Sequence, residues 1–213
     1  MLTMKKIIIS LLLLLPLTLA AQTMKQLFTN MPDTLLSILN KNNRLDLIDF
    51  VEAGMTGKVK NIFEGESRLD TLTANFLSLT TTATGQVQMK LLPTGDTTRV
   101  VCMVQTVCAE ACDSYVRFFT TDWKELPASR FLSLPSQDDF FVSPADSALA
   151  DTLALLRKTV DMTLMRVSLS SASSDLKVTF TTPDYLGKEL KTRLTPFLRP
   201  QIIFRWEKDH YVR

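Results

Sequence analysis

The sequence has 213 residues, of which 46% are hydrophobic and 22% are charged, with only 6 glycines and a formal net charge of +2. This composition is typical of a globular domain and excludes a disordered tail or a low-complexity linker. A chain of this length can bury one substantial core or two small ones.

Residues 1–21 have the features of a secretory signal peptide. Lys5 and Lys6 form a short positive segment, an apolar stretch follows at 7–15, and the segment ends in small residues. It is too short and wrongly flanked for a membrane span that remains in the mature protein. A retained anchor helix is the alternative. No cysteine lies near the expected cleavage site to take a lipid, so we expect a periplasmic or secreted protein with no retained transmembrane segment.

Removal of this segment changes the charge of the protein. It leaves 192 residues and takes away two lysines, so the formal net charge falls from +2 to 0. No surplus of positive charge then argues for nucleic acid or an anionic membrane as a partner.

The central stretch, 97–123, predicts a β-hairpin. Two runs rich in Val, Phe, Tyr and Thr flank a gap of three residues, which is the spacing of a short antiparallel connection. If Cys108 and Cys112 face each other across it, Cys102 lies opposite Phe118. We expect the more uniformly apolar face to meet the core: Val100, Cys102, Val104, Cys108, Cys112, Val116 and Phe118. The other face is mixed, as on a surface partly covered or partly wet: Val101, Met103, Gln105, Val107, Tyr115, Arg117 and Phe119.

The segment before this hairpin predicts helices and then strands. Residues 24–53 read as two short helices, with Pro32 where a helix can begin, a polar break at 40–43 and Gly54 placed to end the second helix. The charges at Arg44, Asp46, Asp49 and Glu52 are expected to form a solvated face. Strands are expected at 58–64, 69–79 and 86–91, and a turn at 93–96 leads into the central hairpin.

The second half predicts a helix, a hairpin, a helix and a strand. Ser143 and Pro144 are typical of a helix start, and a leucine stripe continues to about residue 161. A second hairpin is expected from 163–170 and 176–182. A helix follows over 182–194, and a strand over 201–208 closes the chain.

The predicted fold class is α+β, with helices packed on a mostly antiparallel sheet, or two similar helix-plus-sheet units side by side. Strands follow strands through short turns, which argues against a doubly wound parallel sheet. We divide the mature chain into helices and strands at 22–126, a connection at 127–142 and the second half at 143–213. We expect the two halves to form one compact domain.

The cysteines predict a disulfide and a buried thiol. In an exported protein, a Cys108–Cys112 bridge across the hairpin is simpler than a redox motif or a zinc site, because the spacing is not CxxC and the one histidine, His210, is remote. Cys102 is then interpreted as a buried thiol that acts as a small hydrophobic residue, with an intermolecular bridge as the alternative.

The sequence shows no recognisable catalytic or cofactor motif. It has no Gly-rich phosphate loop, no paired metal-ligand spacing and no nucleophile elbow, so no cofactor and no metal are predicted. Asp138 and Asp139, beside Phe140, are the adjacent carboxylates in an aromatic setting. Adjacent residues of an extended chain point apart, so a solvated loop is favoured over an acid/base pair.

Four segments resemble a family of exported proteins of unknown function from Bacteroidales. They are LFTNMPDTLLSILNKNNRLDLIDF, VKNIFEGESRL, VVCMVQTVCAEACDSYVRFFTTDWKELP and FLSLPSQDDFF, and the most specific part is the CDS-x-x-RF-x-TTDW-x-EL run at 112–126. The resemblance implies a periplasmic or secreted α+β protein of an anaerobic, host-associated Gram-negative bacterium. It brings no catalytic residues.

These observations favour a non-catalytic exported module that binds a protein, a peptide or an envelope component through its sheet or the 124–142 connection. One rival is a hydrolase with a carboxylate site at Asp138 or Asp139. The other is a structural envelope protein that acts by assembly.

Overall fold

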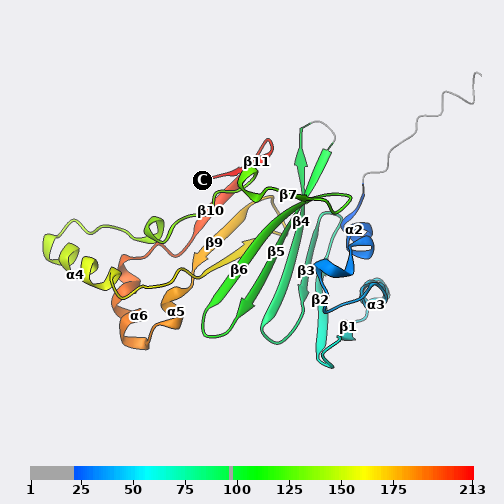
Figure 1. Cartoon of the computed structure of the whole chain (residues 1–213), viewed down its shortest axis with the longest axis horizontal. Coiled ribbons are helices and arrows are strands. Elements are labelled where there is room, and N and C mark those ends of the chain that lie inside the picture. Colours follow the sequence, from blue (N-terminus) through cyan, green and yellow to red (C-terminus); the bar gives the residue numbers. More distant parts are fainter. Residues whose placement is uncertain (1–21, 96–97) are drawn as a thin grey trace, which may run out of the picture.

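The structure is a computed structural model that describes residues 22–95 and 98–213. The predicted signal peptide therefore lies outside the described residues. Two antiparallel sheets occupy the middle of the molecule, with short helices at both ends of its long axis (Figure 1). The predicted α+β class is confirmed. Within the described part of the chain, no helix is long and apolar enough to cross a membrane.

The first sheet has seven strands in the order of the sequence, each antiparallel to the next. They are β1 (Gly57–Lys60), β2 (Glu66–Leu72), β3 (Phe76–Thr80), β4 (Gly85–Thr94), β5 (Thr98–Cys108), β6 (Cys112–Thr120) and β7 (Glu125–Leu126). The stretch predicted as one strand, 69–79, forms two. The Thr73 hydroxyl accepts a hydrogen bond of 3.0 Å from the Phe76 N–H, which stabilises a turn between β2 and β3.

The central hairpin has the predicted register. Cys108 pairs with Cys112, and Cys102 pairs with Phe118. Most of the face that was expected to meet the core is buried between the two sheets, through Val100, Cys102, Val104, Val116 and Phe118. Cys108 and Cys112, at the tip of the hairpin, are only partly buried. The mixed face is covered in part: Val101, Met103 and Phe119 are buried against the N-terminal helices, whereas Val107 and Tyr115 near the hairpin tip are 64% and 65% exposed. The sheet therefore has a core on each side.

The N-terminal helices differ from the prediction in their starting points. They are α2 (Met24–Asn30), the 3-10 turn η1 (Asp33–Leu35) and α3 (Lys41–Glu52). Only a single 3-10 turn follows Pro32. The polar cluster at 40–43 begins α3 instead of breaking a helix, because the side chains of Asn40 and Asn43 form a reciprocal capping box.

Arg44 corrects the expectation of a solvated charged face on α3. Its side chain is 1% exposed. Its guanidinium donates to the backbone oxygens of Met31 at 2.5 Å and Leu39 at 2.9 Å, and to the carboxylate of Asp33 at 2.8 Å. The carbonyls of the loop between α2 and α3 thus find their hydrogen-bond donor in this buried side chain.

The second sheet has four antiparallel strands in the order β11-β10-β9-β8. They are β8 (Met165–Leu169), β9 (Leu176–Phe180), β10 (Ile202–Glu207) and β11 (His210–Val212). The hairpin and the closing strand are confirmed, and β11 is an additional strand that the sequence analysis did not predict. The inward side chains of this sheet, such as Val167, Val178 and Phe204, join the core on one face of the first sheet.

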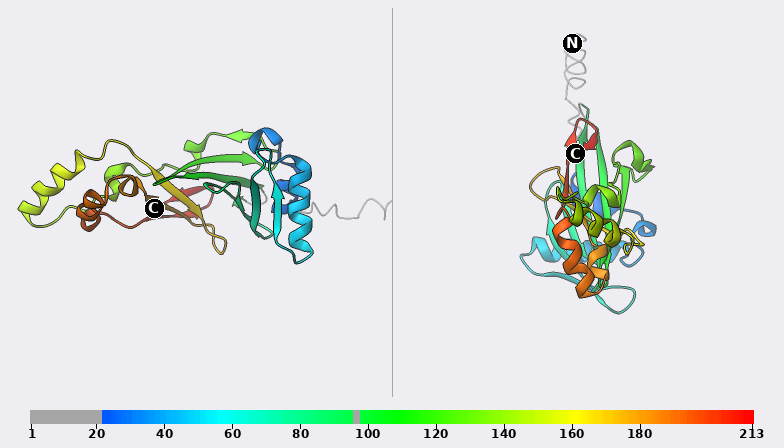
Figure 2. Two further views of the ribbon diagram at one scale, coloured as in Figure 1. Left: turned by 90° about the horizontal axis from the view of Figure 1, so that it is seen from below. Right: turned by 90° about the vertical axis from the view of Figure 1, so that its left-hand side faces the viewer.

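A helical arm extends from the second sheet at the end of the molecule opposite α2 and α3 (Figures 1 and 2). It contains α4 (Ser147–Arg157), α5 (Thr182–Tyr185), α6 (Lys188–Leu194) and the 3-10 turn η4 (Thr195–Phe197). The cap of α4 is Asp146 and not the predicted Ser143, because the Asp146 carboxylate accepts from the N–H groups of Ala148 and Leu149. The predicted helix at 182–194 is broken at Gly187 into α5 and α6.

The connection at 127–142 lies deeper than a surface connection would. It includes two 3-10 turns, η2 (Ala128–Arg130) and η3 (Gln137–Phe140). Four of its side chains are buried in the core between the sheets: Phe131, Leu132, Phe140 and Phe141. Most of its apolar surface is thus used by the fold.

Candidate interaction surface

The tip of the central hairpin is fastened to the second sheet. The structure contains the Cys108–Cys112 disulfide, and the Thr181 hydroxyl donates to the backbone oxygen of Cys112. Directly after the disulfide, the Asp113 carboxylate accepts from the Met165 N–H at 3.2 Å. The disulfide therefore closes the loop from which the contacts to the second sheet begin.

The backbone N–H groups on the outer edge of β8 donate hydrogen bonds to side chains of the first sheet. Ser114 Oγ accepts from the Val167 N–H at 2.9 Å, and Gln88 Oε1 accepts from the Leu169 N–H at 3.0 Å. Asp113, Ser114 and Gln88 thus accept hydrogen bonds from alternate backbone N–H groups of β8. These N–H groups point away from β9 and are not used in the pairing of the two strands. An unpaired strand edge is a template for pairing with another chain, and this one is blocked.

Cys102 lies in the core between the sheets, where it is fully buried. Burial raises the pKa of its thiol far above the ordinary value, and the neighbouring hydroxyl of Tyr211 opposes this rise. Burial also raises the pKa of Tyr211. A protonated, inaccessible thiol has the character of a small hydrophobic residue.

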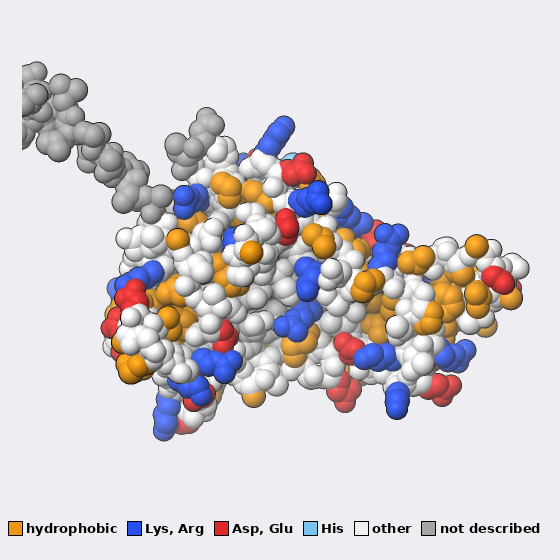
Figure 3. Space-filling model, turned by 180° about the vertical axis from the view of Figure 1, so that it is seen from behind, with side chains coloured by type: hydrophobic (Ala, Val, Ile, Leu, Met, Phe, Trp, Pro, Cys, Tyr) orange, Lys and Arg blue, Asp and Glu red, His pale blue; other side chains and the backbone are white. Residues whose placement is uncertain are grey.

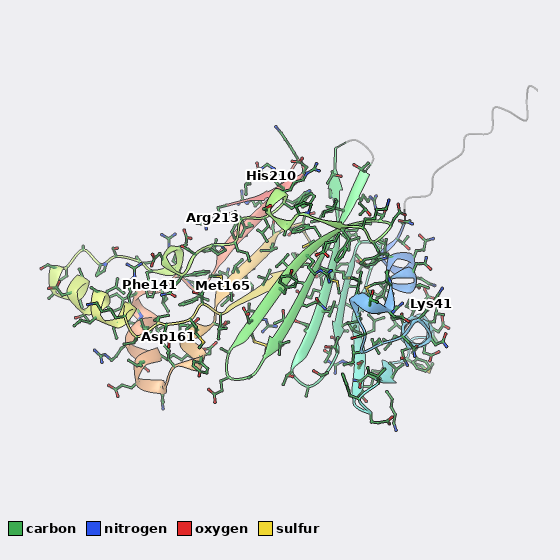
Figure 4. The ribbon with its side chains drawn as sticks, in the orientation of Figure 1. Lys41, Phe141, Asp161, Met165, His210 and Arg213 are labelled. Carbon is green, nitrogen blue, oxygen red and sulfur yellow. A yellow bond between two sulfur atoms is a disulfide. The ribbon has the colours of Figure 1, made fainter. Side chains whose placement is uncertain are left out.

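Asp138 and Asp139 are held in separate ion pairs. Asp138 contacts Arg157 of α4. Asp139 contacts the guanidinium of Arg213, near the C terminus (Figure 4), at 2.5 Å, and it accepts hydrogen bonds from the N–H and hydroxyl of Ser136. These contacts hold the pKa of Asp139 well below its usual range, with Arg213 as the largest cause. The two carboxylates therefore do not form a shared proton site.

Phe140, the third of these neighbouring residues, is fully buried. Its ring stacks on Phe180 of β9 with centroids 5.4 Å apart. It anchors the connection to the second sheet, and it offers no surface to a ligand.

The outer face of the second sheet presents an uncovered row of three positive charges, and the exposed Glu207 of β10 lies on the same face, two residues from Arg205. Arg166 in β8, Lys177 in β9 and Arg205 in β10 all point away from the core and are exposed. None of the three makes an ion pair with another described residue. Figure 3 shows several Lys and Arg side chains on this side of the molecule, with Asp and Glu side chains among them.

The strand register sets the geometry of this row. Arg166 pairs with Thr179, two residues from Lys177, and Lys177 pairs with Ile203, two residues from Arg205. Such diagonal neighbours on one face of a sheet lie roughly 7–8 Å apart. The three cations therefore form a straight diagonal across three adjacent strands.

An open hollow lies beside this row, at the turn between β8 and β9. Its lining includes Ser168, the serine-rich turn at 170–173, Asp175, Lys177 and Ile203. Ile203 is 48% exposed and stands between Lys177 and Arg205. Charged groups, hydroxyls and one apolar side chain thus meet on a single face.

The serine-rich turn rests on a buried lysine. Lys90 of β4 is 2% exposed, and its ammonium donates to the backbone oxygen of Ser171 at 3.3 Å and lies 5.7 Å from the ring centroid of Phe76. Burial lowers the pKa of this ammonium. Lys90 therefore fixes the turn that borders the hollow.

Sequence reasoning did not identify the row of cations. The sequence does indicate that these three side chains face outward, because Arg166, Lys177 and Arg205 each stand between apolar neighbours in a predicted strand. The missing information was that β10 lies beside β9. Among the described residues there is also no group of three or more His, Cys, Asp or Glu side chains that could hold a metal ion.

Fold and surface together define an α+β protein of two antiparallel sheets, one of which leaves open a polar face with a row of three cations. The chain matches the model of a family described as "Protein of unknown function (DUF3256)" over residues 16–211, and it belongs to this family.

A similar solved structure is described as "Structure of a domain of an uncharacterized protein from Porphyromonas gingivalis W83". It is 31% identical in sequence, with a TM-score of 0.75 and with coverage of 89% of this chain and 96% of the other. No match was found among the curated proteins. The family and a relative from Bacteroidales are thus established.

Proposed function

We propose that this protein is an exported, non-catalytic binding module that holds an envelope component on the outer face of its second sheet. The single observation that carries the proposal is the open face itself, with Arg166, Lys177 and Arg205 in a row and Ile203 exposed between Lys177 and Arg205. Exposed polar side chains in a defined arrangement on a rigid sheet are typical of a binding surface.

The geometry favours this face over the other surfaces considered from the sequence. Both sides of the first sheet carry a core, and the connection at 127–142 gives its aromatic side chains to the interior. The hydrolase alternative needs a carboxylate with a raised pKa and a second acid within reach. Asp139 has a lowered pKa and an arginine partner.

The assembly alternative is supported by a different observation. In α4, Leu149 is 48% exposed and Leu155 is 65% exposed, on a helix at the end of the projecting arm (Figure 2). A helix with apolar side chains beyond its covered stripe favours a contact with another protein surface. Sedimentation of the wild type and a Leu155→Glu variant over a range of concentrations tests this candidate, since assembly through α4 requires the variant to dissociate more readily.

Retention on envelope fractions tests the proposed function. The mature chain is incubated with sacculi, purified polysaccharide and outer-membrane vesicles prepared from Porphyromonas gingivalis, and the bound fraction is measured after washing. We expect at least one fraction to retain the wild type, and an Ile203→Glu variant to be retained several-fold less. A Leu155→Glu variant is the control, because its change lies on the arm. Retention of neither protein on any fraction, or equal retention of the Ile203 variant, contradicts the proposal.

A further inference from the structure

We infer that the outer face of the second sheet binds an acidic polysaccharide, whose carboxylates pair with Arg166, Lys177 and Arg205. This inference rests on the proposed function and adds the chemical class of the ligand. It follows from the arrangement of charges, hydroxyls and apolar surface on β8, β9 and β10.

The row of three cations suits a ligand with repeated negative groups. The three cations follow one another at intervals of roughly 7–8 Å along a straight diagonal, and each is exposed. A compact anion can reach one of these positions at a time. A chain with an anionic group on successive sugars can lie along the diagonal and engage all three.

The polar groups between the cations suit a ligand rich in hydroxyls. Ser168 is the cross-strand neighbour of Lys177, and Thr179 is that of Arg166. Both are on the outer face. Each can donate and accept one hydrogen bond or more to a sugar hydroxyl. Ile203, the cross-strand neighbour of Lys177 in β10, supplies an apolar contact for the C–H face of a sugar ring.

The same face is poorly suited to other polyanions. Single-stranded nucleic acid is held by aromatic side chains on which bases stack, and the outward positions of β8, β9 and β10 carry no aromatic residue. An anionic membrane surface requires several apolar side chains to insert, whereas the described part of this face offers only Ile203 and, beside Arg205, the partly buried Val212 of β11. An acidic peptide that adds a strand requires a free edge, and the edge of β8 is occupied by Asp113, Ser114 and Gln88.

Calorimetric titration with a defined acidic chain tests the inference. The probe is an oligogalacturonate, and a neutral galactan oligosaccharide of equal length and a glutamate oligopeptide are run beside it. We expect the wild type to bind the oligogalacturonate, with an affinity that falls as salt is raised, because exposed charges are screened. We expect binding of the neutral chain and the peptide to be at least roughly tenfold weaker.

Matched charge variants locate the site. The triple variant Arg166→Gln, Lys177→Gln, Arg205→Gln is expected to lose roughly tenfold or more in affinity. The control triple variant Lys41→Gln, Lys124→Gln, Lys188→Gln removes the same charge from exposed positions elsewhere on the molecule, Lys41 being at the opposite end (Figure 4). It is expected to keep the wild-type affinity. Urea unfolding of both variants checks that each remains folded.

Several results would overturn the inference. They are absence of binding to the oligogalacturonate, equal binding of the neutral chain or the peptide, and an equal loss in both triple variants. A failure of the oligogalacturonate to bind can be distinguished from a failure of the proposed function. If the oligogalacturonate does not bind but envelope retention still depends on Ile203, the face binds a ligand of another class. If retention does not depend on Ile203, the proposed function fails as well.

Discussion

Ser114 Oγ in β6 accepts a hydrogen bond of 2.9 Å from the backbone N–H of Val167 in β8. The same oxygen lies 2.8 Å from Thr106 Oγ1 in β5, so one hydroxyl joins two strands of the first sheet to the edge of the second. This contact is one of several that hold the sheet with the candidate surface against the first sheet, together with those of Asp113 and Gln88.

The Ser114→Ala variant tests this connection. It leaves the partly buried N–H of Val167 without its acceptor, and we expect the free energy of unfolding to fall by about 1–3 kcal/mol. Urea denaturation measures the change. Ser168→Ala is the matched control, because this serine lies on the outer face of β8 and makes no side-chain hydrogen bond to another described residue; its effect should stay within about 0.5 kcal/mol. Equal effects of the two variants would contradict the role of Ser114.

Arg44 gives a second stability prediction. The Arg44→Leu variant removes the donor for the backbone oxygens of Met31 and Leu39 and leaves these buried acceptors unsatisfied. We expect a loss of about 2–4 kcal/mol in the free energy of unfolding, measured by urea denaturation. Lys41→Leu, at an exposed position in the same helix, should change it by less than about 0.5 kcal/mol. A loss below about 1 kcal/mol for the Arg44 variant would show that the loop finds other donors.

The difference between Arg44 and the central hairpin explains what the sequence could predict. In the hairpin, three residues separate the strands, so the pairing of Cys102 with Phe118 follows from local spacing and strand alternation. The partners of Arg44 lie in an irregular loop without any periodicity, so its burial was not predictable. For the same reason the row of Arg166, Lys177 and Arg205 was not predicted. A stretch of 21 residues separates β9 from β10, and local patterns do not place these two strands side by side.

The cysteines allow a prediction by mass and labelling. The folded protein should resist thiol labelling, and after unfolding without reductant it should accept one label, at Cys102. Replacement of both Cys108 and Cys112 by serine should lower the free energy of unfolding by about 2 kcal/mol. The loss is modest because the bridge closes a very short loop, and the stabilisation by a disulfide grows with loop length. Intact mass and peptide mapping check the assignments. Three labelled thiols in the unfolded, unreduced protein would exclude the disulfide.

Lys90 predicts a pH dependence of stability. Its pKa is lowered in the folded protein by burial, whereas in the unfolded chain it should be near the ordinary value of about 10.4. Between these two values the unfolded state binds more protons than the folded state, so the contribution of Lys90 to stability rises with pH. Below both values the lysine is charged in both states, and burial of the ammonium opposes folding.

The comparison of the wild type with a Lys90→Met variant isolates this contribution. Methionine keeps the unbranched apolar stem and removes the charge. We expect the free energy of unfolding of the wild type, relative to the variant, to increase as the pH is raised from neutral toward about 10.4. Lys41→Met, at an exposed position, should show no such trend. A wild-type-to-variant difference that is constant over this range would mean that the Lys90 ammonium keeps its ordinary pKa beneath the serine-rich turn, and that the turn is held by packing alone.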